Sequence, residues 1–222
     1  MYFYFRRPTL LVILCASFFL VGFSIQGEGD RILGEAISYV IKLDDFEADF
    51  LYEFQAPNRR NHKKSGKILA KDQGARYSIL LDEQEVYMDG QTLWVYLPSH
   101  NEVMVLPGDG DTENVMESIF KLFMFKESSE YLGKDLVNGH ECDKIFVRLK
   151  NSPDVNYQKA YVWIGQLPRP RMIEKITFLD EGQRTTSYIF TKIQPNRGLT
   201  LERFRFNSNN YPDVTVVDQR DD

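Results

Sequence analysis

The side chains that most often catalyse reactions or bind metals are few and scattered in this 222-residue sequence. His62, His100 and His140 each fall in an expected turn, and no two of them have the spacing of metal ligands. Cys142 stands two residues after His140, but two neighbours on a strand or turn do not make a catalytic dyad, and a buried core cysteine is expected. The sequence also lacks a Gly-x-Ser-x-Gly elbow. It therefore predicts no enzyme, no bound metal and no cofactor.

Regularly spaced apolar side chains are the chemical feature that the chain has in excess, and 14% of its residues are aromatic. From residue 46 to 54, every second side chain is apolar, and three of the four between them are acidic. This period of two predicts a strand with one apolar face. Such a face can bind acyl chains or other apolar ligands.

A second apolar pattern has the period of a helix, which we expect from Glu113 to Phe125 with Asp111 or Thr112 as its cap. Its stripe consists of Val115, Ile119, Leu122 and Phe123, and it is widened by Met116, Phe120 and Met124. A surface helix needs an apolar arc of only about 100°. Two interpretations stay open: a central core helix, or a lid with one side on a sheet and the other towards a ligand.

These two patterns, with the strand around residues 76–81, supply the candidate lipid-binding residues. They are Phe46, Phe50, Tyr52, Phe54, Ile79, Leu81, Val115, Ile119, Leu122 and Phe123.

The rest of the chain predicts a mainly β (α+β) fold of one domain. A helix is expected over Asp30–Leu43 with Asp30 as its N-cap, and a polar turn over Pro57–Lys64. Further strands are expected over 66–71, 76–81, 85–88, 92–97, 102–106, 130–137, 142–149, 160–164, 171–179, 185–193 and 203–206. About ten or eleven strands with hairpin-length loops favour an antiparallel sheet or open barrel.

The first 24 residues have the pattern of a secretory signal peptide. Arg6 and Arg7 form a positive start, residues 10–21 form a short apolar run, and Gly22 and Ser24 are small residues before a cut. The run is shorter than the roughly 20 residues of a membrane span. Leu14 before Cys15 argues against a lipidated product. The mature domain is then expected to cover residues 25–222.

The charge of the chain argues against a nucleic-acid partner. Its formal net charge is −5, and removal of the two arginines of the signal would leave −7. Proteins that bind nucleic acid neutralise phosphates with clustered basic side chains.

Several strings, in order, resemble the LolA family of periplasmic lipoprotein carriers. The first is Gln84 to Pro98, with Asp89-Gly90 in a tight turn, followed by Leu93-Trp94-Val95-Tyr96-Leu97-Pro98. Asn101-Glu102-Val103, the ending from Phe204 to Arg220, and the opening helix followed by Phe46-x-Ala48-x-Phe50 are also similar. The resemblance covers essentially the whole mature chain. Asp89, Gly90, Trp94, Tyr96 and Pro98 are its structural motif residues.

The resemblance implies an incomplete β-barrel with two or three helices as a lid. Acyl chains of a lipoprotein would bind on the concave apolar face of a monomer that uses no cofactor. The carrier would receive its load from an inner-membrane lipoprotein-releasing transporter and pass it to an outer-membrane acceptor. It would act in the periplasm as a chaperone in outer-membrane biogenesis.

One motif of the family is missing. Members often have an Arg-Pro pair after the second strand, and its arginine latches the lid; the matching stretch here is Lys71-Asp72-Gln73-Gly74. Arg76 is expected to start the next strand, so no latch residue is assigned. Other functions stay open: a carrier of another lipid or glycolipid, a periplasmic sensor or interaction module on the same fold, and an enzyme.

The exported protein should begin near Ile25 and carry no lipid, because the apolar run is short and ends in small residues. Intact-mass measurement of the protein purified from the periplasm checks this. A mass that includes residues 1–24, or a diacylglycerol on Cys15, would contradict it.

Overall fold

The computed structural model describes residues 27–108, 115–152, 156–169 and 171–220, apart from the side chains of Glu117 and Phe120. The expected signal peptide, Glu113 at the start of the second helix and its caps Asp111 and Thr112 lie outside the described residues.

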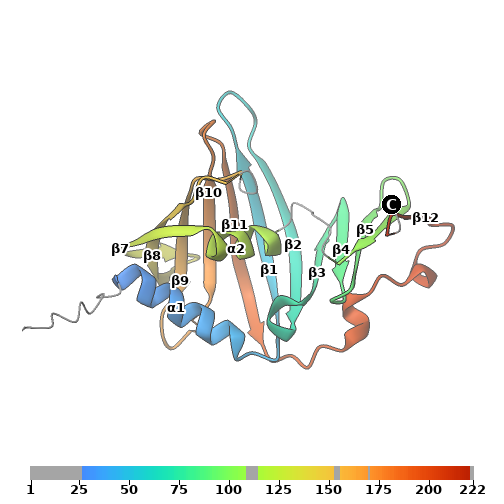
Figure 1. Cartoon of the computed structure of the whole chain (residues 1–222), viewed down its shortest axis with the longest axis horizontal. Helices are drawn as coiled ribbons and strands as arrows, with labels where there is room; N and C mark the ends of the chain where they lie inside the picture. The colour runs from blue at the N-terminus through green and yellow to red at the C-terminus, as the bar shows by residue number, and fades with distance from the viewer. Residues whose placement is uncertain (1–26, 109–114, 153–155, 170, 221–222) are drawn as a thin grey trace, which may run out of the picture.

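Twelve strands form one open sheet in the described residues, so the expected fold class is confirmed (Figure 1). The strands are β1 Asp45–Gln55, β2 His62–Lys71, β3 Arg76–Leu81, β4 Gln84–Met88, β5 Thr92–Leu97, β6 Glu102–Pro107, β7 Lys126–Val137, β8 His140–Leu149, β9 Lys159–Gly165, β10 Ile173–Leu179, β11 Thr185–Pro195 and β12 Thr215–Asp218. Their order is β12-β6-β5-β4-β3-β2-β1-β11-β10-β9-β8-β7, and the sheet is not closed into a barrel.

Two meanders make up most of this sheet, and they meet where β1 pairs with β11. β1 to β6 form the first meander and β7 to β11 the second, each strand antiparallel to the next. At the junction, Phe50 lies opposite Phe190 and Tyr52 lies opposite Tyr188. The two meanders are thus hydrogen-bonded to each other along one strand pair.

Two helices cover one face of the sheet, which we call the inner face. Helix α1 spans Glu28–Ile41 and lies against β7, β8 and β9, and α2 spans Val115–Met124 (Figure 1). Buried side chains of both helices, including Ile32, Leu33 and Leu122, share one core with alternate residues of β1 to β5 and β8 to β11. The inner face is therefore the apolar face that the period of two predicted.

The hairpin of β1 and β2 is longer than expected. The polar turn was expected to reach Lys64, but β2 begins at His62, which lies opposite Phe54. Because the ladder continues to this point, Lys63 and Lys64 belong to the strand and not to the turn. The hairpin projects beyond the neighbouring strands at one end of the sheet (Figure 1).

The expected strand at residues 203–206 is wrong. Leu201–Phe204 forms a short 3-10 helix, η2, and a second, η3, spans Ser208–Asn210. Phe204 is fully buried and both of its neighbours are exposed. This alternation resembles that of a strand, and four residues are too few to distinguish a strand from a 3-10 helix. The last strand is β12, which pairs parallel with β6.

The expected N-cap at Asp30 is also wrong, since α1 begins at Glu28 after Gly27. The carboxylate of Asp30 instead accepts a hydrogen bond from the Ser129 hydroxyl at 2.6 Å and pairs with Lys126. These contacts, led by the bond from Lys126, hold the pKa of Asp30 below its ordinary value. Asp30 thus joins the helix to β7.

A buried carboxylate ties the end of β11 to the start of β1. The Asp45 side chain is 1% exposed and accepts hydrogen bonds from the backbone amides of Arg197 and Leu199 at 2.6 and 2.7 Å. The Lys71 ammonium lies 3.6 Å from it. Asp45 therefore holds the chain where it leaves β11 for the C-terminal segment.

Replacing Asp45 with alanine should lower the free energy of unfolding by about 2–4 kcal/mol, because the backbone amides of Arg197 and Leu199 lose a charged acceptor. Urea unfolding of the purified protein measures this. Asp44→Ala is the matched control, since its side chain is exposed, and it should change stability by less than about 0.5 kcal/mol. Equal losses in the two variants would contradict the assigned role of Asp45.

Candidate binding cavity

A cavity of about 230 Å³ lies between α2 and the inner face. Its apolar wall comes from β1, β3, β4, β11 and α2, through Phe50, Tyr52, Ile79, Leu81, Val86, Val115 and Tyr188. Alternation places these strand side chains on one face because successive side chains of a strand point to opposite sides. The cavity is the space that the helices leave over the apolar inner face.

Aromatic rings make one continuous wall beneath this cavity. The Tyr188 ring centroid lies 5.5 Å from that of Tyr52 and 6.1 Å from that of Phe50. Phe178 of β10 lies 6.5 Å from Tyr188, and Tyr157 lies 4.7 Å from Phe178. Tilted and edge-to-face pairs at such distances are favourable. The wall crosses the β1–β11 junction, so both meanders contribute to the cavity.

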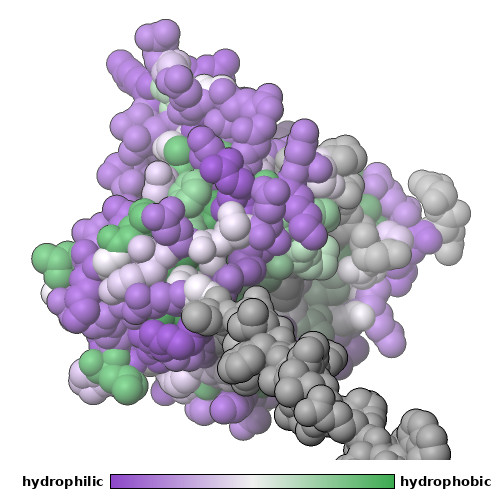
Figure 2. Space-filling model, turned by 60° about the vertical axis from the view of Figure 1, so that its left-hand side comes forward, coloured by the Kyte–Doolittle hydropathy of each residue, from purple (hydrophilic) through white to green (hydrophobic). Residues whose placement is uncertain are grey.

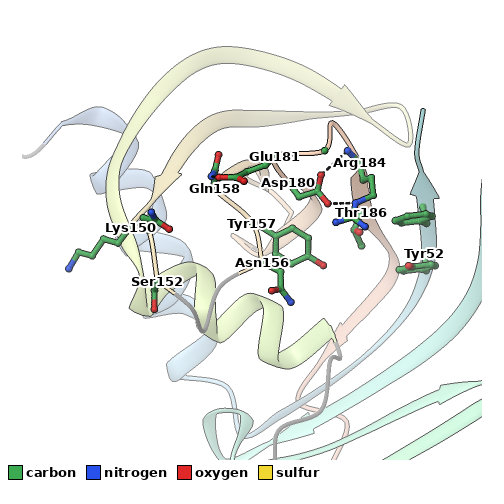
Figure 3. Close-up of a pocket in the computed structure, with 13 residues that line it drawn as sticks. Tyr52, Lys150, Ser152, Asn156, Tyr157, Gln158, Asp180, Glu181, Arg184 and Thr186 are labelled. Carbon is green, nitrogen blue, oxygen red and sulfur yellow. Dashed lines mark hydrogen bonds and ion pairs between the residues drawn. The ribbon is translucent and has the colours of Figure 1, made fainter. Parts of the chain in front are cut away.

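A larger, more polar vestibule of about 660 Å³ adjoins the cavity and shares Tyr52, Asn156, Tyr157 and Thr186 with it. Figure 3 shows Tyr157 pointing into the space between α2 and β11, with the ion pair of Asp180 and Arg184 above it in this view. A ligand with an apolar tail and a polar end would meet matching surroundings in this order: vestibule for the polar end, cavity for the tail.

Charged side chains lie at the rim of the cavity. Lys64 of β2 pairs with Glu83 of the β3–β4 turn, and Lys121 of α2 also lines the cavity. The pair joins the base of the projecting hairpin to the rim.

The structure brings together half of the candidate lipid-binding residues and separates the others. Phe50, Tyr52, Ile79, Leu81 and Val115 line the cavity, and Phe54 lines the vestibule. The remaining four do not line either space: Leu122 is buried in the core, and Phe46, Ile119 and Phe123 are half-buried and packed against it.

Helix α2 combines features of both interpretations that its sequence allowed. Leu122 is 1% exposed and Val115 is 2% exposed, so one side belongs to the core. Val115 and Ser118 also line the cavity, whereas Met124 is 68% exposed to solvent. The helix is anchored on the sheet and at the same time forms one wall of the cavity.

The motif residues of the β4–β5 hairpin lie on the outer face or in turns, away from the cavity. Trp94 and Tyr96 are opposite Tyr87 and Glu85 of β4, and Tyr96 lies 4.3 Å from the ring of Tyr211 in the C-terminal segment. This segment crosses the outer face, where Tyr211 donates a hydrogen bond to Glu85 at 2.5 Å and the ring of Phe206 stacks on that of Tyr211 at 4.7 Å. The ring of Tyr96 thus packs against the C-terminal segment.

Asp89, Gly90 and Pro98 shape the turns around β5. The Asp89 carboxylate accepts hydrogen bonds from the amides of Gln91 and Thr92 at 3.0 Å, and from Arg205 at 2.9 Å. Burial opposes ionisation, but these donors hold the pKa of Asp89 below its ordinary value. Gly90 has a φ of +97°, which side chains rarely tolerate. Pro98 begins the turn to β6, and its carbonyl accepts a hydrogen bond from the Asn101 amide.

Arg76 is engaged away from the cavity. It begins β3 and pairs with Asp72 in η1, the 3-10 helix of Asp72–Gly74. Arg76 pairs with Asp72 and does not line the cavity, so it is not assigned as the latch of a lid.

Cys142 and the three histidines do not line the cavity. Cys142 is buried as expected, and burial together with the Glu174 carboxylate raises the pKa of its thiol to about 12, which makes it a poor nucleophile. All three histidines are exposed. Within the described part of the chain, no group of three His, Cys, Asp or Glu side chains could hold a metal ion.

None of the helices in the described part of the chain is long and apolar enough to cross a membrane.

The cavity residues that sequence reasoning missed include Val86, Tyr157, Thr186 and Tyr188. Val86, Thr186 and Tyr188 follow the period of two in strands that were expected, but the sequence did not indicate which face was inward. The pairing of Tyr188 with Tyr52 joins positions about 136 residues apart. Tyr157 lies in a loop, for which no periodic signal exists.

The sequence profile described as "Outer membrane lipoprotein carrier protein LolA" matches residues 43–207, well over half of the chain. The chain belongs to the LolA family. The expected family is thereby confirmed. The match begins just before β1 and ends after Phe206, so it includes every strand that lines the cavity. No curated protein sequence matches the chain.

Solved structures share the fold of this family member at low sequence identity. An uncharacterized conserved protein from Thermus thermophilus is 12% identical with a TM-score of 0.56, over 85% of this chain and 98% of its own. MucB is 15% identical with a TM-score of 0.51, over 85% of this chain and 65% of its own. At these identities the similarity establishes the fold alone.

Leu122→Ala should lower the free energy of unfolding by about 2–5 kcal/mol, because it leaves a cavity where α2 meets the core. Met124→Ala, two positions along the same helix, should cost less than about 0.5 kcal/mol because its side chain is in solvent. Urea unfolding of both variants tests how α2 is anchored. A small effect of Leu122→Ala would mean that the helix packs only loosely on the sheet.

Proposed function

We propose that this protein is a periplasmic, non-enzymatic carrier that binds the acyl chains of lipoproteins and moves them from the inner to the outer membrane. The observation that carries the proposal is the apolar cavity between α2 and the inner face, with a polar vestibule at its mouth. Membership in the LolA family and the secretory pattern of residues 1–24 support it.

The size of the cavity indicates how such a carrier would work. At about 230 Å³ it is smaller than the roughly 300–1,000 Å³ of most ligand pockets. A long acyl chain would therefore enter as the side chains of α2 and the aromatic wall move apart. Each buried methylene contributes about 0.8 kcal/mol, so a few carbons give useful affinity while the cost of opening keeps the complex reversible.

The partners in this proposal follow from the family. An inner-membrane lipoprotein-releasing transporter would supply the load and an outer-membrane acceptor would receive it. The carrier would act as a monomer and without a cofactor.

Ser118→Trp should weaken the binding of an acylated peptide by about ten-fold or more, because Ser118 lines the cavity and an indole would fill much of its volume. The variant should still fold, since overpacking costs about 1–3 kcal/mol. Displacement of a fluorescent fatty acid by a lipoprotein-derived peptide with its N-terminal acyl chains measures binding. Melting temperature is recorded on the same sample.

Met124→Trp is the matched control, because it adds the same ring on the solvent side of α2 and should bind as the unchanged protein does. The same peptide without acyl chains should not displace the probe. Normal binding by a folded Ser118→Trp variant would refute the cavity as the site. Displacement by free fatty acids or glycolipids but not by the acylated peptide would favour a carrier of another lipid.

A further inference from the structure

A dense cluster of positive charge occupies the turn between β1 and β2 and the strand β2 itself, whereas β1 carries four carboxylates. Residues 55–71 contain six Lys and Arg side chains and no Asp or Glu, although the whole chain has a net charge of −5. All other residues together therefore carry −11. The basic side chains are Arg59, Arg60, Lys63, Lys64, Lys67 and Lys71.

Ion pairs account for the cations along the strand but not for those at the tip. Lys63 pairs with Glu53 at 2.5 Å, Lys64 pairs with Glu83, and Lys67 lies 3.1 Å from Asp49. Arg59 and Arg60 are exposed, and no carboxylate of the described chain forms an ion pair with either. Their charges are therefore available to an external anion.

The position of the hairpin relates this charge to the cavity. Its tip is at the projecting end that lies uppermost in Figures 1 and 2, where mainly hydrophilic side chains cover the surface. Lower on the same hairpin, Phe54 lines the vestibule and Tyr52 and Lys64 line the cavity. A surface that touches the tip would thus be close to the mouth of the binding site.

We propose that the tip of the β1–β2 hairpin docks the protein on membranes rich in anionic lipids, with the mouth of the cavity turned towards the bilayer. The two available cations, Arg59 and Arg60, are both exposed in the turn between β1 and β2. Exposed charges on a projecting turn fit an extended anionic plane better than a single phosphate, which needs donors that surround it. Pro57, Asn58 and Asn61 at the tip offer no apolar wedge, so contact stays at the headgroups.

The acidic remainder of the molecule orients this contact. An anionic surface repels most of the protein and attracts the hairpin, and the force acts within a Debye length of about 10 Å at 0.1 M salt. The inference goes beyond the proposed function, because it concerns how the protein meets a bilayer and not what fills the cavity.

Vesicle flotation tests the proposal with the mature protein and two kinds of vesicle, pure phosphatidylcholine and a mixture with phosphatidylglycerol. The protein should float with the anionic vesicles, and not with the neutral ones. Binding should fall as salt rises from about 0.05 to about 0.5 M. Arg59→Glu/Arg60→Glu should weaken binding by about ten-fold or more.

Arg197→Glu/Arg203→Glu is the matched control, because it changes the net charge equally at exposed positions in the segment that follows β11. It should keep most of the vesicle binding. Equal losses in both double variants, or no binding to anionic vesicles at low salt, would overturn the proposal. If the unchanged protein bound no vesicles and the hairpin variant still took up less lipoprotein from membranes, the proposal would also be overturned and an acidic protein partner would be favoured.

Acyl-peptide binding by the hairpin variant is measured in parallel. Because Arg59 and Arg60 do not line the cavity, this binding should be unchanged. Failure of the docking proposal is thereby distinguished from failure of the carrier proposal.

Discussion

A broad sheet with one apolar face must keep that face out of water, and the rest of this structure follows from that requirement. The sheet stays open, so closure does not hide the face, and α1 and α2 cover it instead. Two short helices cannot fill all the space above twelve strands. The cavity beside α2 is the part they leave, and it is lined by the same alternating side chains that build the core. The wall of the cavity and the core are one continuous apolar face.

The outer face of the same sheet is covered by ion pairs and by the C-terminal segment. Ion pairs such as Lys67 with Glu47 cover β1 and β2, while the C-terminal segment lies over β3 to β5 with Phe204 fully buried. β12 then pairs with β6 and forms the outermost strand at that edge of the sheet. The family motif around Trp94 and Tyr96 belongs to this outer packing. A motif can thus mark a family through residues that hold the scaffold and lie away from the cavity.

Much of the fold could be predicted from the sequence because local spacing determines the strands. The alternation from Phe46 to Phe54 puts Phe50 and Tyr52 on one apolar face, and in the structure both line the cavity together with Val115 of the helical stripe. Local spacing contains no information on which distant strands pair, so Tyr188 was missed. Local spacing also failed where tertiary contacts determine the structure. The Asp30 carboxylate binds Ser129 of β7 and does not cap its own helix, and the buried Phe204 belongs to a 3-10 helix and not to a strand.

The junction of β1 and β11 has a consequence for folding speed. The paired residues are about 130–150 positions apart, so this ladder has a high contact order, and contacts of that kind form slowly. Strand β1 is synthesised early, but the edge that pairs with β11 gains its neighbour only after residues 185–195 have followed. During that interval β1 has an unpaired edge and an exposed apolar face, and it can pair wrongly with other chains. Its alternating acidic residues, Glu47, Asp49 and Glu53, give the waiting strand a charge that opposes such association.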